Sequence, residues 1–109
     1  MGYRSDVSLE LKKEANDIFQ ALYAQEFPED IEFLSSNIEK ETDEATLYCW
    51  SDVKWYDTYP EVSFIGNFIS ELDENDYRFV RIGEEYEDNE TGGYSEEFNL
   101  NIHRSIYWE

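Results

Sequence analysis

The fold is decided by one stretch of sequence, ATLYCWSDVKWY at residues 45–56. Aromatic and β-branched residues dominate it, and such residues favour strands because they pack well on a pleated sheet. Its side chains alternate between two faces, as a strand requires. The first face carries Leu47, Cys49, Val53 and Trp55, and the second carries Thr46, Tyr48, Trp50 and Tyr56. We therefore expect the longest strand of a sheet here, ended by a turn at residues 57–60.

An amphipathic helix is predicted on each side of this strand. Upstream, residues 12–25 carry apolar side chains at helical spacing, and Pro28 stops the helix. Downstream, Pro60 occupies a first-turn position, where its missing N–H is not needed. The apolar positions of the downstream helix are Val62, Ile65, Phe68, Ile69 and Leu72. This helix is expected to end at residues 73–76.

Four further strands are expected where apolar and polar residues alternate. They are residues 3–11, 31–38, 77–82 and 98–108. Residues 39–44 are predicted to form a polar turn, and Thr91-Gly92-Gly93-Tyr94 a hairpin turn. The order is then β-α-β-β-α-β-β, with residues 1–109 in a single acidic domain. This order favours an α+β two-layer sandwich, in which two helices cover one face of a mostly antiparallel sheet of about five strands.

The charge excludes several classes of protein. The 109 residues include 8 Lys+Arg and 27 Asp+Glu, which gives a formal net charge of −19. Such a chain repels nucleic acid and anionic membranes, so we expect it to bind neither directly. Aromatic residues make up 17% of the chain, which argues for a folded core because disordered acidic chains are poor in aromatics.

The location expected for the chain is the cytoplasm. Cys49 is the single cysteine, so there is no disulfide framework to indicate secretion. The N-terminus lacks the pattern of a signal peptide, and no apolar run approaches the ~18 residues of a membrane span.

Catalysis is not expected, and no catalytic residue, metal or cofactor is assigned. Cys49 and His103 are each unique and form the one possible nucleophilic dyad, but neither has a recognisable motif around it. Carboxylate pairs carry little information among 27 acids. The segment at residues 87–93 fails as a calcium loop, because no Glu stands at its twelfth position.

The acidic clusters are the most distinctive feature of the chain. The plain interpretation is a solubilising surface, but that explains a net charge of about −2 to −8, not −19. The alternative is a surface that imitates the phosphate backbone of a nucleic acid, with exposed tyrosines as anchors. The candidate partner-binding residues are Glu71, Asp73, Glu74, Asp76, Glu84, Glu85, Glu87, Asp88, Glu90, Tyr86 and Tyr94. Arg78 and Arg81, by contrast, are expected to pair with carboxylates within the protein, as are Arg4 and Asp6 with each other.

Three stretches carry a resemblance: MGYRSDV at residues 1–7, DVKWY with YPEV at residues 52–62, and YRFVRIGE at residues 77–84. Their combination resembles a group of small uncharacterised proteins of bacteriophages and prophages. The resemblance implies a viral origin and supplies no activity or site. Small phage proteins are often inhibitors of host defence, including CRISPR-Cas and restriction enzymes, and several such inhibitors are acidic DNA mimics.

These observations lead to three hypotheses. The first is a phage-encoded, non-enzymatic inhibitor, monomeric or homodimeric, that occupies the basic DNA- or RNA-binding groove of a host nuclease complex. The second is an interaction module that binds an effector protein through its aromatic sheet face without mimicking nucleic acid. The third is a small hydrolase that uses clustered carboxylates or Cys49 and His103.

Overall fold

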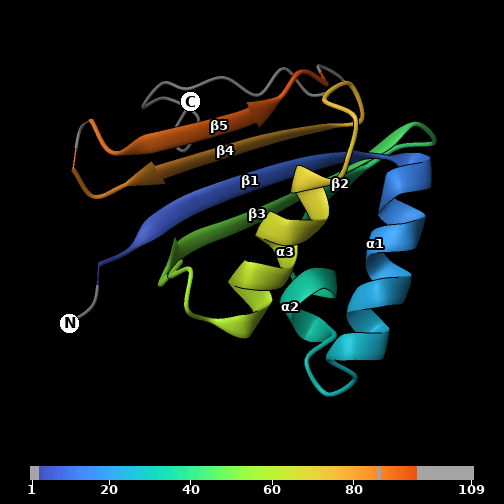
Figure 1. Cartoon of the computed structure of the whole chain (residues 1–109), viewed down its shortest axis with the longest axis horizontal. Coiled ribbons are helices and arrows are strands. Elements are labelled where there is room, and N and C mark those ends of the chain that lie inside the picture. Colours follow the sequence, from blue (N-terminus) through green and yellow to red (C-terminus); the bar gives the residue numbers. More distant parts are fainter. Residues whose placement is uncertain (1–2, 86, 96–109) are drawn as a thin grey trace.

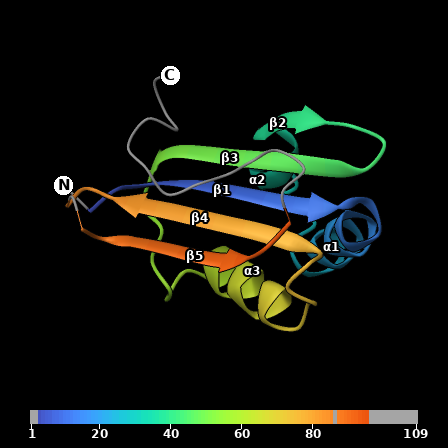
Figure 2. The same ribbon diagram turned by 90° about the horizontal axis from the view of Figure 1, so that it is seen from above.

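Five strands form one antiparallel sheet in the order β2-β3-β1-β4-β5. The structure is a computed structural model, and it describes residues 3–85 and 87–95. The strands are β1 (Ser5–Lys12), β2 (Ile38–Glu41), β3 (Ala45–Val53), β4 (Tyr77–Gly83) and β5 (Asn89–Gly93). Figure 2 shows them side by side, with β1 at the centre. The expected α+β fold with a five-stranded antiparallel sheet is confirmed.

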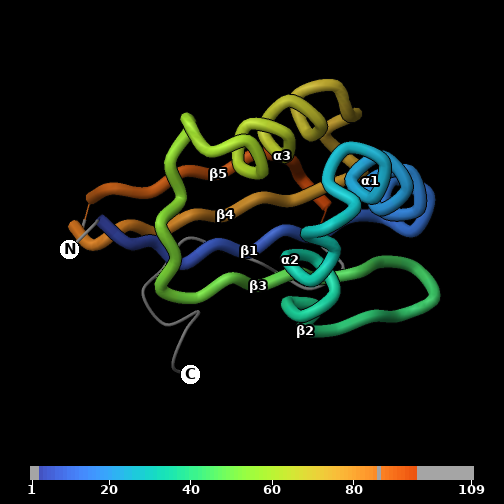
Figure 3. Tube along the Cα trace, turned by 90° about the horizontal axis from the view of Figure 1, so that it is seen from below, coloured from blue at the N-terminus to red at the C-terminus, as the bar shows by residue number. Residues whose placement is uncertain are grey.

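Three helices lie on one face of this sheet (Figure 1). They are α1 (Lys13–Glu26), α2 (Glu32–Ser35) and α3 (Pro60–Ser70). Seen from below, α3 follows the β4–β5 side of the sheet and α2 lies under β1 and β3 (Figure 3). Both predicted helices are present, and α2 is an addition to them. Within the described residues, no helix is long and apolar enough to cross a membrane.

The core between the two layers is aromatic. Phe19 and Tyr23 of α1 pack against Tyr48 and Trp50 of β3, and all four side chains are buried. Phe79 of β4 belongs to the same buried cluster. Burying one side chain of this size stabilises a fold by about 2–3 kcal/mol, so the aromatic content that argued against disorder forms the centre of the domain.

The expected strand at residues 31–38 is wrong, because its first half is the helical turn α2. Phe33 and Leu34 are adjacent apolar residues, and a helical turn allows both to point under the sheet. The ring of Phe33 stacks on that of Trp50 at 5.3 Å, and its carbonyl accepts a 2.8 Å hydrogen bond from the indole N–H. The strand β2 then falls within the expected polar turn, where charged residues suit a short edge strand.

The hairpin turn expected at Thr91–Tyr94 is also wrong, since Thr91, Gly92 and Gly93 belong to β5. The connection between β4 and β5 lies earlier, at residues 84–88. Gly93 has φ +76°, and a Cβ atom there would lie 2.0 Å from the carbonyl oxygen of Tyr77. The glycines therefore allow β5 to approach β4 closely and do not form a turn. The strand expected at residues 98–108 lies outside the described residues.

The expected division of residues 45–56 into two faces holds only as far as Trp50. The register between β1 and β3 shifts between Ser5 and Val7, and Asp52 opposite this shift has φ +56°. Such a bulge adds a residue and reverses the alternation beyond it. Trp55 therefore packs on Trp50 in the core, at 5.3 Å between ring centroids, and not with the face that carries Cys49.

Candidate partner-binding surface

Strand β4 separates the two acidic segments that the sequence singled out. Glu71–Asp76 connect α3 to β4, and residues 84–88 follow β4 at its other end (Figure 1). A strand of seven residues spans roughly 20 Å. The two segments are therefore different surfaces, and we call them the α3–β4 corner (Glu71, Asp73, Glu74 and Asp76) and the β4–β5 loop (Glu84, Glu85, Glu87 and Asp88).

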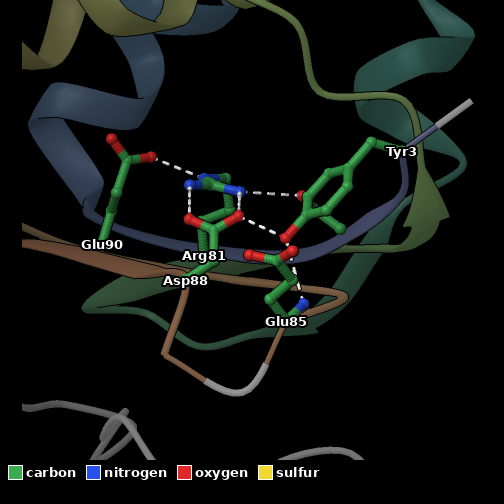
Figure 4. A network of polar contacts seen from close by, with 6 residues as sticks. Tyr3, Arg81, Glu85, Asp88 and Glu90 are labelled. Carbon is green, nitrogen blue, oxygen red and sulfur yellow. Dashed lines mark hydrogen bonds and ion pairs between the residues drawn. The ribbon is translucent and has the colours of Figure 1, made fainter.

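The β4–β5 loop is held by Arg81, as Figure 4 shows. The guanidinium group donates to Asp88 Oδ1 at 2.8 Å, to Glu90 Oε1 at 2.6 Å and to Ser5 Oγ at 2.9 Å. Glu90 faces Arg81 directly across β4 and β5. The expectation that Arg81 pairs with carboxylates is therefore confirmed, and two of the candidate partner-binding acids are its partners.

Tyr3 completes this network from the start of the chain. Its hydroxyl donates to Asp88 Oδ2 at 2.5 Å and accepts a hydrogen bond from the Glu85 N–H at 3.1 Å. Asp88 thus lies between Tyr3 and Arg81 (Figure 4). The hydrogen bond from Arg81, with that from Tyr3, lowers the pKa of the Asp88 carboxyl. Asp88 is therefore held as a carboxylate whose charge is used inside the protein.

The Arg81 guanidinium is partly withdrawn from solvent, with 13% of its side chain exposed. Burial alone would lower its pKa, but the hydrogen bonds that it donates to Asp88 and Glu90, with the negative charge of both, outweigh burial and the pKa is raised. Arg81, Asp88 and Glu90 together carry one net negative charge, whereas the two carboxylates alone would carry two. We refer to Tyr3, Arg81, Asp88 and Glu90 as the loop brace.

Arg4 also links the β4–β5 loop and the end of β3 to the start of the chain. Its N–H donates to Glu84 Oε2 at 2.6 Å, and its guanidinium donates to the Asp52 carbonyl at 3.0 Å. Asp6 accepts a 2.7 Å hydrogen bond from the Asp52 N–H, which supports the left-handed backbone of Asp52. The predicted Arg4–Asp6 pair is thus replaced by two separate contacts with Asp52, because the bulge brings that residue between them.

The α3–β4 corner differs because its acids form no ion pair within the described residues. Glu71, Asp73 and Glu74 are exposed, and no Lys or Arg of the described residues forms an ion pair with any acid of the corner. The main chain is nevertheless fixed. The Asp76 carbonyl accepts from Lys12 N–H at 3.0 Å and the Glu74 carbonyl from Tyr94 N–H at 2.6 Å. The corner therefore presents uncompensated charge on an ordered backbone.

A third acidic segment lies at the same end of the sheet. Glu41 ends β2, Asp43 and Glu44 follow it in the connection to β3, and all three are exposed. The Glu44 carbonyl accepts from Lys13 N–H at 2.9 Å, directly beside the Lys12 bond to the corner. Since β3 and β4 flank β1, the two segments lie roughly 10 Å apart. We call the two together the acidic sheet end.

The candidate tyrosines have different outcomes. Tyr94 follows β5 at the acidic sheet end, where its side chain is 64% exposed. Tyr86 lies outside the described residues. The sequence identified the corner and Tyr94 but did not associate Glu41, Asp43 and Glu44 with them, because only strand order brings these segments to one end. It also gave no signal for Tyr3, which is distant along the chain from its partner Asp88.

Within the described residues, little resembles a catalytic or metal centre. Burial raises the pKa of the Cys49 thiol, although a contact with Ser8 Oγ at 3.4 Å opposes this. A raised pKa reduces the thiolate fraction that nucleophilic chemistry requires. His103 lies outside the described residues. In the part of the chain that is described, no three His, Cys, Asp or Glu side chains are grouped to hold a metal ion.

The aromatic side of the sheet is not a free surface. Tyr48 and Trp50 are at most 1% exposed, because the helices cover that face. Burial raises the pKa of Tyr48 to about 12, which reflects this lack of solvent. A partner could reach these residues only if the helices moved.

Comparison with known proteins adds no assignment. No family model, no curated protein and no solved structure matches the chain significantly.

Proposed function

We propose that this chain is a phage-encoded, non-enzymatic inhibitor of a host defence system, a CRISPR-Cas effector or a restriction nuclease. It acts in the cytoplasm of the bacterial host, where its acidic sheet end occupies a basic groove that binds DNA or RNA. The observation that carries the proposal is the set of exposed carboxylates at this end, which form no ion pair within the described residues although the main chain beneath them is fixed.

The geometry of the acidic sheet end suits a nucleic-acid-binding groove. Its two segments are roughly 10 Å apart, between the widths of about 6 Å and 12 Å of the two grooves of B-DNA. The main chains of the two segments are therefore separated by a distance of the same order as the width of a nucleic-acid groove. The net charge of −19 would also accelerate encounter with a basic partner.

Retention of uncompensated charge also supports the proposal. Like charges repel, so exposed acids without cations lower the stability of the folded state. At the opposite end of β4, Arg81 forms ion pairs with two acids and offsets one of their two charges, so the chain does place a cation beside carboxylates there. The resemblance of residues 1–7, 52–62 and 77–84 to phage proteins agrees with an inhibitor of host defence.

The test compares two variants of equal charge in capture from a bacterial lysate. Glu71→Gln/Glu74→Gln removes two charges from the acidic sheet end, and Glu29→Gln/Glu87→Gln removes two exposed charges elsewhere. We expect capture of a nucleic-acid enzyme that duplex DNA displaces and that the first variant weakens more than the second. Recovery of no nucleic-acid enzyme, or equal loss in both variants, would contradict the proposal.

The alternative is an interaction module that binds an effector protein without mimicry. One observation favours it: Ile18 and Leu22 lie one turn apart on α1 and are 56% and 43% exposed. Salt distinguishes the two modes, because charge mimicry weakens steeply with ionic strength and an apolar interface does not. Ile18→Ser/Leu22→Ser would abolish binding in the alternative mode and leave it unchanged in the proposed one.

A further inference from the structure

A groove of about 290 Å³ lies between α3 and the β4–β5 side of the sheet. Its apolar lining comes from both layers, and it includes Trp55, Val62, Ile65, Ile69, Tyr77 and Phe79. Two carboxylates, Asp57 and Glu90, also line it, and among the described residues no Lys or Arg does. The groove therefore combines an apolar floor with a negative rim.

Two glycines, Gly66 and Gly92, line the groove. Gly66 lies on α3, and a Cβ atom at this position would meet nothing within 4 Å. Neither packing nor a left-handed backbone therefore requires glycine at Gly66. Glycine inside a helix costs about 1 kcal/mol relative to alanine. On the opposite wall, a Cβ at Gly92 would press on the Tyr77 ring at 3.3 Å.

The charges of the groove favour a cation. Asp57 is exposed and has no ion pair within the described residues. Glu90 receives the Arg81 Nε–H on one oxygen, Oε1. Arg81 divides its single charge between Glu90 and Asp88, so the neighbourhood of the groove stays negative. A second copy of this acidic chain is disfavoured as an occupant for the same reason.

An arginine side chain matches both features of the groove. Its aliphatic stem suits apolar walls such as Ile65 and Ile69. Its planar guanidinium stacks on aromatic rings and donates two parallel hydrogen bonds to a carboxylate. Lysine carries a more strongly hydrated point charge and stacks less well. An uncharged apolar side chain would leave the two carboxylates without a partner.

We propose that this groove binds an arginine side chain presented by a basic partner protein. The groove would hold one residue at a fixed place, whereas the acidic sheet end attracts positive charge over a wide area. Binding of arginine here does not require that the partner be a nuclease or that its groove bind nucleic acid. The two proposals can therefore fail separately.

The experiment is an NMR titration of the whole ¹⁵N-labelled chain with N-acetyl-arginine N-methylamide. Saturating shifts are expected at the amides of Gly66 and Gly92 and at the Trp55 indole N–H. The matched probes are the corresponding lysine and norleucine amides, which change the cation and remove it, respectively. Roughly fivefold weaker binding is expected for each, which corresponds to about 1 kcal/mol for a stacked or charge-assisted contact.

Variants at Gly66 provide the structural control. Gly66→Leu fills the groove and is expected to weaken arginine binding at least roughly fivefold, whereas Gly66→Ala leaves most of the space and retains it. Asp57→Asn is a second variant that does not depend on helix packing, and it is expected to weaken binding of the arginine amide but not of the norleucine amide. Equal binding of the three amides would overturn the proposal, as would arginine shifts confined to the acidic sheet end and unchanged in Gly66→Leu.

Discussion

The two acidic segments beside β4 have similar sequences and different surroundings. In the β4–β5 loop, Asp88 and the neighbouring Glu90 are bound by Arg81, and Tyr3 fixes Asp88 from the other side. In the α3–β4 corner, hydrogen bonds of the main chain fix the segment, and Asp73 also accepts one from the Asn75 N–H at 2.9 Å. Among the described residues, no Lys or Arg forms an ion pair with its acids, and Glu71, Asp73 and Glu74 are exposed. Carboxylates that are bound internally stabilise the fold, whereas those at the corner are available to a partner.

Removal of Arg81 is expected to have the largest effect on this difference. Arg81→Met would leave Asp88 and Glu90 without a cation and lower the free energy of unfolding by about 2 kcal/mol. The loss stays below that of a fully buried pair, because Asp88 and Glu90 are 34% and 59% exposed and can be hydrated again. Urea unfolding measures it. Lys54→Met is the control, since Lys54 is exposed and has no ion pair within the described residues. Equal effects would show that only net charge matters.

Protonation of Asp88 should weaken the brace at low pH. The pKa of Asp88 is lowered from its ordinary 3.8 by Arg81 and Tyr3. Its contribution is therefore complete above about pH 4 and is lost as pH falls through the lowered value. The difference in stability between wild type and Asp88→Asn should accordingly shrink in acid. Thermal unfolding from pH 7 down to pH 3 checks this, with Glu87→Gln as an exposed control. A constant difference across this range would contradict the pairing.

Two tyrosine variants compare the two ends of the sheet, because each removes one hydroxyl: Tyr3 in the loop brace and Tyr94 at the acidic sheet end. Tyr3→Phe loses the hydrogen bonds to Asp88 and from Glu85, so the protein should unfold at a lower urea concentration. The hydroxyl of Tyr94 makes no hydrogen bond within the described residues, so Tyr94→Phe should leave the midpoint unchanged. If both variants lose the same stability, the difference between the two ends is not as described.

The smallest expected effect is a gain in stability at the corner. Glu71→Gln/Glu74→Gln relieves repulsion between like charges and should raise the melting temperature by about 2 °C at low salt. Addition of about 1 M salt should remove the gain, because the Debye length falls to roughly 3 Å. Differential scanning calorimetry at both salt concentrations measures it. A loss of stability would indicate internal partners for these acids.

Local patterns predicted the elements better than they predicted the site. Helical spacing in α1 and α3 survives in the fold, as does the alternation that places Val7, Leu9 and Leu11 of β1 and Phe79 of β4 on the core face. The expected wet face of β1 is wrong, because Ser8 and Glu10 are buried as well, and Val80 and Ile82 of β4 are also buried on that face. The pattern at residues 31–38 was misleading, since Phe33 reaches the core through a helical turn. Gly92 and Gly93 suggested a turn because glycine is common in turns. Glycine also occurs where two strands pack closely, and the sequence alone does not distinguish the two uses.

The site depended on contacts that no local pattern encodes. Arg81 could be predicted to bind carboxylates, because few cations are available in an acidic chain. Its particular partner Glu90 follows from the register of β4 with β5, and Tyr3 reaches Asp88 only because β1 lies next to β4. The grouping of Glu41 and Glu44 with the corner likewise follows from the positions of β3 and β4 on either side of β1.

The sequence by itself determined the charge of −19 and the α+β class, since both depend on residue type and local periodicity. Only the tertiary structure decided which carboxylates are neutralised and which are left exposed. The physical reason is that an ion pair requires two side chains within a few ångströms, and strand order and register set that distance. The same order placed Gly66 opposite Gly92 across one groove, although the two residues lie in different layers.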